Sequence, residues 1–231
     1  MGASFEVVRR LAEAVAESME RGAFPLVLSG NCMSSIGVVA GLGRDVGVVW
    51  LDAHPDFNTT EESLSGFADG MGLSILSGTG WRALRETVPG YRAVPESNVV
   101  LVGIRDINPP EQERLEASAV EVIAPAEATE RIGPALDRLR GRVADAYLHL
   151  DLDVLDPSEG RANEYAAPGG IAAANVERII DAVGDRLAIR GAAVTAYDPA
   201  ADPEGRIPNT AARLMARIAA AAQAKLEVVR Q

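Results

Sequence analysis

Several residue types that define common protein classes are scarce or missing in this chain. Cys32 is the only cysteine among 231 residues, which excludes a disulfide framework and suggests a reducing compartment. The 22 Lys and Arg are outnumbered by 33 Asp and Glu, and the net charge of −11 disfavours nucleic acid as a partner. No glycine-rich nucleotide motif, membrane-length apolar run or signal peptide is found. We therefore expect a cytoplasmic protein that binds neither nucleic acid nor membranes.

What the chain does contain is a regular alternation of apolar and amphipathic segments. Short runs rich in Val, Ile and Leu are expected as buried strands at 24–30, 46–54, 98–106, 120–125, 146–156 and 191–199. Helical patterns lie between or beside them at 5–21, 33–42, 70–87, 111–117, 126–141, 173–186 and 208–227. This alternation predicts an α/β fold, with helices on both faces of a mainly parallel sheet. We expect one domain over residues 1–231.

Two acidic motifs follow expected strands, where open parallel sheets bind ligands. They read "DAHPDFN" (52–58) and "HLDLDVLDP" (149–157). In an extended chain Asp52 and His54 share a face, Asp56 can follow, and Asp151 and Asp153 are paired likewise. Four carboxylates and an imidazole in one crevice would repel one another without cations, so the motifs predict a site for divalent ions. The alternative is that these aspartates are caps, turn formers and solvated strand ends.

Both motifs resemble signatures of the arginase/agmatinase/formiminoglutamase family, the ureohydrolases, which read D-A-H-x-D-x-N and S-x-D-x-D-x-x-D-P. "GIRDINPPE" (103–111) and "PGGI" (168–171) resemble two further family segments in the same order. The resemblance covers the chain from about residue 20 onwards. It implies a three-layer α/β/α, arginase-like fold and a trimer or hexamer. It also implies a small guanidino or amidino substrate and two Mn²⁺ ions, whose bridging hydroxide attacks the guanidinium carbon.

Carried over by position, the resemblance assigns roles to individual residues. The implied metal ligands are Asp52, His54, Asp56, Asp151 and Asp153. Asp52 and Asp151 would bridge the two ions, His54 and Asp153 would complete one site, and Asp56 would serve the other. Asp56 would also orient the hydroxide. Asn58 and Ser65 match positions that contact the amino-acid end of the substrate.

The first departure from the family pattern is Cys32, which stands where a histidine ligates the first metal. A thiolate is a softer ligand that favours Zn, Co or Fe over Mn, so we expect the first site to be weakened or to take another divalent metal. The alternative is a small buried thiol without a ligand role. His149 is also open to two interpretations, as a residue that points towards the site or as a core histidine.

Further departures affect the substrate end. Asp69 replaces a histidine that carries the leaving-group proton, and its reference pKa of about 3.9 suits that task only if raised. Its alternative role is to begin a helix from Gly70. Ala196 replaces a glutamate that binds the guanidinium, with Asp198 as the candidate substitute. In an atypical loop, Glu164 and Tyr165 either enter the pocket or cover the loop.

The family strand and loop that usually precede residues 24–30 are missing or reduced to the helix expected at 5–21. Together the departures predict a hydrolase of linear C–N bonds that differs from plain arginase or agmatinase. A hydroxyguanidino or formimino compound is the expected type of substrate. The alternative is a non-catalytic, metal-binding regulator or assembly subunit, because positions 32, 69 and 196 have lost a ligand, a proton carrier and a substrate contact.

Overall fold

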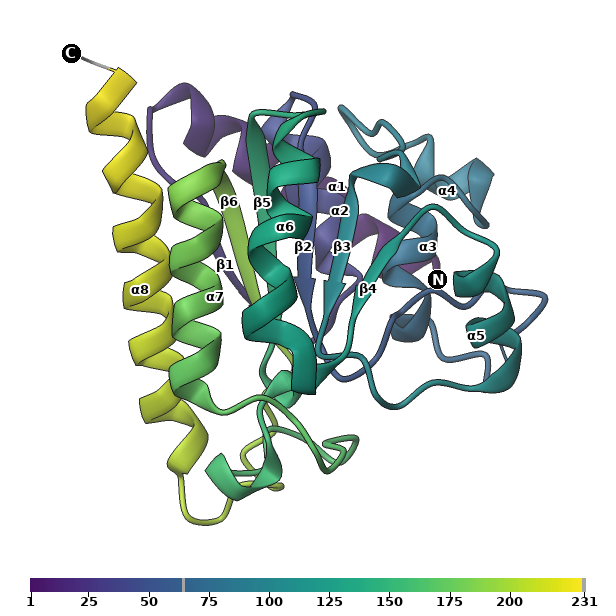
Figure 1. Cartoon of the computed structure of the whole chain (residues 1–231). Helices are drawn as coiled ribbons and strands as arrows, with labels where there is room; N and C mark the ends of the chain where they lie inside the picture. Colours follow the sequence, from purple (N-terminus) through teal and green to yellow (C-terminus); the bar gives the residue numbers. More distant parts are fainter. Residues whose placement is uncertain (64, 230–231) are drawn as a thin grey trace.

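A parallel sheet forms the centre of the molecule (Figure 1). The computed structural model describes residues 1–63 and 65–229, and within them six strands pair in the order β1-β6-β5-β2-β3-β4. The strands are β1 (Leu26–Ser29), β2 (Gly47–Leu51), β3 (Val99–Val102), β4 (Glu121–Ile123), β5 (Asp145–Asp151) and β6 (Ala188–Thr195). All these pairs are parallel, and each strand overlaps one of the six apolar segments predicted from the sequence.

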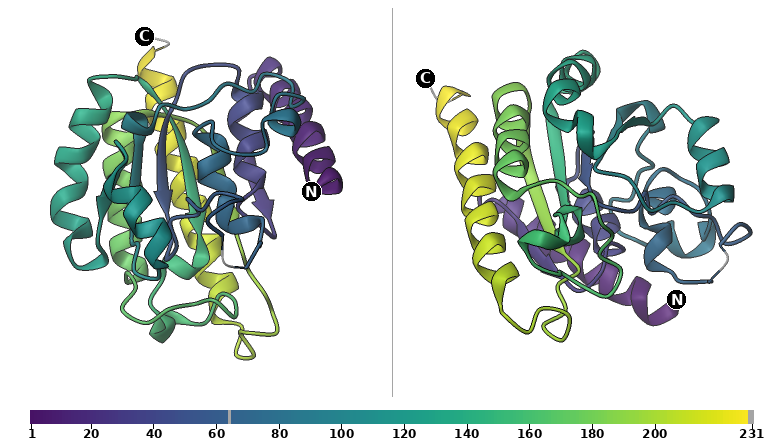
Figure 2. Two further views of the ribbon diagram at one scale, coloured as in Figure 1. Left: turned by 90° about the vertical axis from the view of Figure 1, so that its right-hand side faces the viewer. Right: turned by 60° about the horizontal axis from the view of Figure 1, so that its bottom comes forward.

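Helices cover both faces of the sheet (Figure 2). One face carries α6 (Ala128–Arg140), α7 (Ala173–Arg186) and α8 (Arg206–Val229). The other face carries α1 (Gly2–Glu20), α2 (Ser34–Leu42) and α3 (Gly72–Leu76), while the connections contain α4 (Arg82–Arg85) and α5 (Pro109–Glu116). Within the described residues, no helix has both the length and the apolarity to span a membrane. The predicted three-layer α/β/α fold with a parallel sheet is confirmed.

The strand β2 shows how one sheet serves two cores. Val49 and Leu51 pack into the hydrophobic core that includes α6, α7 and α8. Val48 and Trp50 point to the opposite face and pack into the core that includes α1 and α2. Because successive strand residues face opposite sides, a continuous apolar run is what a strand buried on both faces requires.

The single helix predicted over 70–87 is wrong. The chain instead forms a short 3₁₀ turn (Asp69–Met71), then α3, and later α4. Gly78 and Gly80 separate the two helices and adopt φ values of 95° and 68°, which lie outside the right-handed helical region. Because the spacing of hydrophobic residues continues across these glycines, the helical periodicity did not reveal the break between the two helices.

The extended geometry predicted for the two acidic motifs is also wrong, although their side chains converge. β2 ends at Leu51 and β5 at Asp151, earlier than predicted. Asp151 then accepts a hydrogen bond from the Asp153 N–H at 2.9 Å and caps a 3₁₀ turn. Asp56 adopts a left-handed φ of 49°. Tight turns, rather than strand alternation, therefore aim these carboxylates.

The register of the sheet brings the motifs together. Leu51 pairs with Leu150, so Asp52 and Asp151 leave neighbouring strands side by side. Asp151 in turn pairs with Thr195 on β6, and Ser29 at the end of β1 pairs with the same threonine. The carboxyl ends of four adjacent strands thus meet at one edge, where parallel sheets bind ligands.

We predict that Gly41→Ala destabilises the contact between α1 and α2. A Cβ atom on Gly41 would lie 2.5 Å from the Ala12 carbonyl oxygen and 2.7 Å from Val15 Cβ, so the helices must separate. Overpacking of this kind costs about 1–3 kcal/mol of unfolding free energy, measurable by urea denaturation. Gly2→Ala is the matched control, because a Cβ there meets nothing within 4 Å. Equal stability of the two variants would contradict the prediction.

Candidate metal centre

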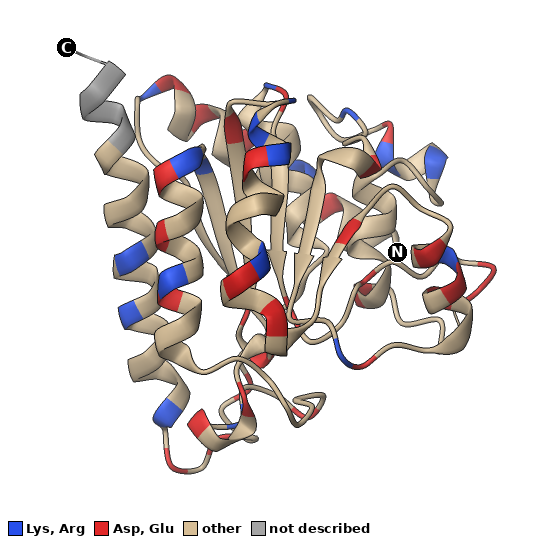
Figure 3. Ribbon diagram, in the orientation of Figure 1, with Lys and Arg blue, Asp and Glu red and all other residues tan. Residues whose placement is uncertain are grey.

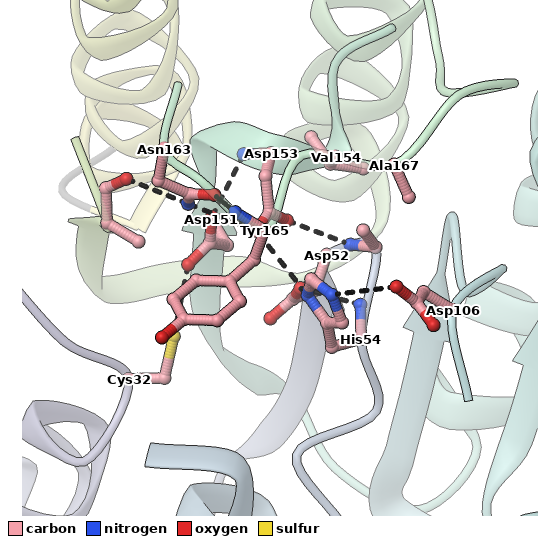
Figure 4. Close-up of polar contacts among 12 residues, drawn as sticks. Cys32, Asp52, His54, Asp106, Asp151, Asp153, Val154, Asn163, Tyr165 and Ala167 are labelled. Carbon is pink, nitrogen blue, oxygen red and sulfur yellow. Dashed lines mark hydrogen bonds and ion pairs between the residues drawn. The ribbon is translucent and has the colours of Figure 1, made fainter. Parts of the chain in front are cut away.

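Side chains from both acidic motifs converge at the carboxyl edge of the sheet (Figure 4). Donor atoms of Asp52, His54 and Asp153 lie within 4.8 Å of one another. His54 Nδ1 is 3.4 Å from Asp52 Oδ1 and 3.4 Å from Asp153 Oδ2. On its other side, His54 Nε2 is 3.7 Å from Asp106 Oδ2. The imidazole therefore lies between three carboxylates.

A second group of donors lies deeper in the molecule. It consists of Cys32, Asp52, His149 and Asp151, whose donor atoms also lie within 4.8 Å of one another and whose side chains are all buried. The Cys32 thiol donates to Asp151 Oδ2 at 3.1 Å. Asp52 belongs to both groups, so the two clusters are contiguous. His149 had two open interpretations from the sequence, and here it is a core residue whose ring also approaches the cluster.

Asp56 is the remaining predicted ligand, and its geometry is unusual. It is 6% exposed, and its Oδ2 atom has no hydrogen-bond partner among the described residues. A non-glycine residue with positive φ stores strain of about 1–3 kcal/mol, which the surrounding structure must hold in place. The Asp56 carbonyl does so by accepting from the N–H groups of Leu73 and Ser74 at 3.0 and 3.2 Å. Among the described residues, Asp56 is not part of either donor group.

The shifted pKa values of these buried residues also indicate a site for a cation. Burial and the charge of Asp153 raise the pKa of Asp52 to about 7, and burial with neighbouring carboxylates raises the pKa of Asp56 and Asp151 well above the usual range. Burial alone would lower the pKa of His54, but Asp153 and Asp52 raise it to about 12. Burial opposes ionisation of Asp153, yet His54 lowers its pKa to about 2. The His54–Asp153 ion pair leaves other buried carboxylates uncompensated, and divalent cations fit this donor set.

Four residues that hold this arrangement were not identified from the sequence. Arg105 donates to backbone carbonyls on two loops, including Asp153 O at 2.7 Å and Ala167 O at 2.8 Å. Asn163 donates to Asp153 Oδ2 at 3.1 Å, and Thr195 donates to Asp151 Oδ2 at 2.9 Å. The remaining residue is Trp50, whose indole donates to Asp52 at 3.0 Å.

The segment "GIRDINPPE" (103–111) did indicate some of the residues that hold the metal centre in place. It contains Arg105 and also Glu111, a buried residue that accepts from the Phe57 N–H at 2.8 Å. Glu111 thereby fixes the loop that carries Asp56. The sequence offered no comparable signal for Asn163 or Thr195, because their contacts depend on which strands are neighbours.

A cavity of about 440 Å³ opens above the clusters. Its lining includes every residue predicted to bind substrate, namely Asn58, Ser65, Glu164 and Asp198, together with Asp69 and Tyr165. Nine of the described lining residues are Asp or Glu, and none of them is Lys or Arg. Acidic residues follow several strand ends in this region (Figure 3). Such a lining favours a cationic ligand and offers a carboxylate-bearing tail no ion pair.

Ala196 and Asp198 are both on this lining. Ala196 presents no polar side chain to the cavity. Asp198 is exposed, and its Oδ1 accepts from the Ala200 N–H at 2.9 Å, which leaves its other oxygen for a ligand. Glu164 and Tyr165 are exposed too, so these two loop residues and the candidate substitute Asp198 lie at the rim rather than on the floor.

Asp69 takes part in a contact that the sequence did not suggest. Its Oδ1 accepts from the Met33 N–H at 3.0 Å, next to the start of α2, and burial raises its pKa. The alternative role of beginning a helix at Gly70 is not what its side chain does, since the 3₁₀ turn starts at Asp69 itself and the carboxylate caps another segment. Asp69 is also part of the cavity lining.

Comparison with known proteins places this chain in a family. The sequence model described as "Arginase family" matches residues 1–222. The arginase of Bacillus caldovelox is 31% identical over 220 residues, which make up 91% of this chain and 73% of that protein. The arginase of Staphylococcus aureus (strain MRSA252) is 33% identical over 175 residues, or 72% of this chain and 57% of that protein.

Solved structures agree with the sequence match. The native structure of the Bacillus caldovelox arginase at pH 5.6 superposes with a TM-score of 0.87 and 30% identity, over 94% of this chain and 75% of that one. The chain spans roughly three quarters or less of these relatives. The match covers the strands, both acidic motifs and the loops around the cavity. By sequence and by fold, the chain belongs to the arginase family.

Proposed function

We propose that this chain is a metal-dependent hydrolase of linear C–N bonds in a small guanidino or amidino cation. The observation that carries the proposal is the meeting of two carboxylate clusters at the floor of one acidic cavity. Membership of the arginase family supports the same chemistry. The chain would work as a single domain in the cytoplasm and, as the resemblance implies, as a trimer or hexamer.

The residues that would hold ions are Cys32, Asp52, His54, Asp56, Asp151 and Asp153, with room in the two clusters for two ions. Mn²⁺ is the ion that the resemblance implies, and Cys32 weakens that preference at the deeper position. When bound, such ions polarise the substrate and lower the pKa of water so that hydroxide forms near neutral pH. Asp56 would accept a hydrogen bond from the nucleophile through its free Oδ2 and so orient it.

The cavity walls would select and position the substrate. Asn58 and Ser65 would contact the end remote from the reacting carbon, and Glu164 and Asp198 would supply negative charge near the rim. Ala196 offers no carboxylate at the position where the resemblance implies a glutamate that binds an unmodified guanidinium. A hydroxyguanidino or formimino group, which brings its own polar atom or lacks one amino group, suits this floor better than arginine does.

Asp69 would carry the proton to the leaving amine. It lines the cavity, and its raised pKa brings the protonated form closer to neutral pH than an exposed aspartate would be. The Met33 N–H holds Asp69 Oδ1 at 3.0 Å and so fixes the position of the carboxyl group. Asp69 would thereby take the role that the resemblance assigns to a histidine.

A substrate panel tests the proposal. Wild-type protein loaded with Mn²⁺ or Zn²⁺ is expected to release urea, hydroxyurea, formamide or ammonia from one of the modified compounds, at least 10-fold faster than urea from arginine. Asp151→Ala should lower kcat/KM at least 100-fold, because it removes a ligand of the deeper cluster. Asp45→Ala, which removes an exposed carboxylate on a distant turn, is the control.

Two other outcomes of the substrate panel would contradict the proposal. Efficient urea release from arginine would contradict the altered substrate. If metal-loaded protein hydrolyses no compound in the panel, the non-catalytic alternative is favoured. The alanine at position 196 already supports that alternative, because it removes a substrate contact implied by the resemblance.

The effects of two substitutions on kcat and KM would show whether Asp69 carries the proton. Asp69→Asn keeps an oxygen for the Met33 N–H but cannot carry a proton, so kcat should fall about 10²–10⁴-fold with little change in KM. Glu164→Gln should instead raise KM and leave kcat nearly unchanged, since it removes only rim charge. The measurement is steady-state kinetics across pH on the preferred substrate. Equal losses of kcat in the two variants would refute the assignment of Asp69.

A further inference from the structure

Two exposed aromatic side chains meet at the mouth of the cavity, although aromatic residues make up only 4% of the chain. Phe67 and Tyr165 are each 51% exposed, and both line the cavity. Their rings are stacked, with centroids 5.9 Å apart and an interplanar angle of 30°. Exposed apolar surface that borders a cavity is a common mark of a ligand-binding site. The metal centre uses neither ring, so the pair is available to a ligand at the rim.

Hydrogen bonds fix the two loops that carry the rings. The Tyr165 N–H donates to Asn163 Oδ1 at 2.9 Å, and Asn163 Nδ2 donates in turn to Asp153 Oδ2 at 3.1 Å (Figure 4). One amide side chain therefore holds both a carboxylate of the metal centre and the backbone of Tyr165. The Phe67 N–H donates to Ser65 Oγ at 3.1 Å, in a loop that also lines the cavity. The aromatic pair thus has a set position relative to the metal centre.

The rim that carries the rings also carries carboxylates. Glu164 and Asp198 are exposed on the cavity lining, and the side chain of Asp106, another lining residue, is 62% exposed. The charge of Glu164 raises the pKa of the Tyr165 hydroxyl, which places that carboxylate near the ring. None of the described lining residues is Lys or Arg. A positively charged ligand group is therefore favoured at this rim, whereas a carboxylate is repelled.

The combination of rings and carboxylates favours one kind of cation. Carboxylates alone suffice to bind a primary ammonium group, which is compact and strongly hydrated. An aromatic face adds attraction through its quadrupole, and it does so best for a cation that sheds water easily, such as an N-methylated ammonium group. In a stacked pair each ring keeps one face uncovered, so both Phe67 and Tyr165 can offer a face to such a group.

We propose that Phe67 and Tyr165 bind an N-methylated ammonium group at the remote end of the substrate and so determine its specificity. The substrate would then be a dication, with its guanidino or amidino group at the metal centre and its second charge at the rim. Glu164 and Asp198 would compensate that second charge, while Asn163 would position Tyr165. This inference rests on the proposed function and refines it by naming the remote group.

Equilibrium binding of three inert probes tests the aromatic site without any turnover. Choline carries a trimethylammonium group, 3,3-dimethylbutanol is its neutral isostere, and ethanolamine is its primary-ammonium counterpart. The metal-loaded full chain should bind choline at least 5-fold more tightly than either of the other probes, as measured by NMR titration. The reason is that a partly exposed cation–π contact contributes about 2–10-fold in affinity.

Substitutions of the rings show whether they cause this preference. Phe67→Leu and Tyr165→Leu keep an apolar side chain but remove an aromatic face, so each should lower the preference for choline at least 2-fold. Tyr165→Phe keeps the ring and should retain the preference. Val7→Ala is the control, because Val7 is an exposed apolar residue of α1 outside the cavity lining.

Turnover provides a second measurement. Among compounds with the preferred reacting group, the one with a remote trimethylammonium group should have a kcat/KM at least 10-fold above those with a remote ammonium or carboxylate group. Phe67→Leu should raise the KM of that compound with little change in kcat, since the ring lies far from the reacting atoms.

The two measurements separate this inference from the proposed function. Equal affinity for choline and 3,3-dimethylbutanol, or a choline preference that survives both leucine substitutions, would overturn the inference. Faster turnover of the ammonium or carboxylate compound would contradict it too, while the hydrolase function would stand. A choline preference that depends on the rings, without turnover of any guanidino or amidino compound, would instead refute only the hydrolase function.

Discussion

The mutual repulsion of buried carboxylates is the constraint on which the rest of this structure depends. The pairing of β5 beside β2 places Asp151 next to Asp52 at the buried ends of the two strands. Water cannot solvate their charges there, so the protein must supply hydrogen-bond donors, protons or cations. The indole of Trp50 and the imidazole of His54 supply part of that compensation. The remainder explains why the site suits divalent ions.

The supporting residues can be understood as responses to the same constraint. Arg105 does not pair with the carboxylates; it binds the backbone carbonyls that would otherwise point unsatisfied into the loop after β5. Its positive charge still lies close enough to help Asp153. Glu111 holds the strained loop at Asp56 by accepting a backbone N–H. Rigid backbone contacts thus keep charged ligands in positions that they would leave if free to relax.

The sequence predicted those features that depend on local pattern. Apolar runs located all six strands, and the spacing within "DAHPDFN" and "HLDLDVLDP" located the acidic residues that meet. It failed where geometry depends on single backbone angles, as at Gly78 and Gly80, which divide the helix predicted over 70–87. Contacts between distant segments were hidden for another reason: the closeness of Cys32 and Thr195 follows from the neighbouring positions of β1 and β6, which no local pattern encodes.

The departures from the family pattern differ in kind according to their depth in the cavity. At position 196 the carboxylate is gone, but the backbone is still held: φ is 63°, and the Ala196 carbonyl accepts from Asn163 Nδ2 at 2.9 Å. At position 32 a thiol stands where the resemblance implies an imidazole, and its sulfur lies within 4.8 Å of donor atoms of Asp52 and Asp151. The loss of a side chain on an intact backbone, as at position 196, alters which ligand can bind. The exchange of one metal-binding residue type for another, as at position 32, preserves the capacity to hold an ion. The donor groups at the floor of this cavity are therefore suited to a metal ion, whereas position 196 offers a ligand no polar side chain.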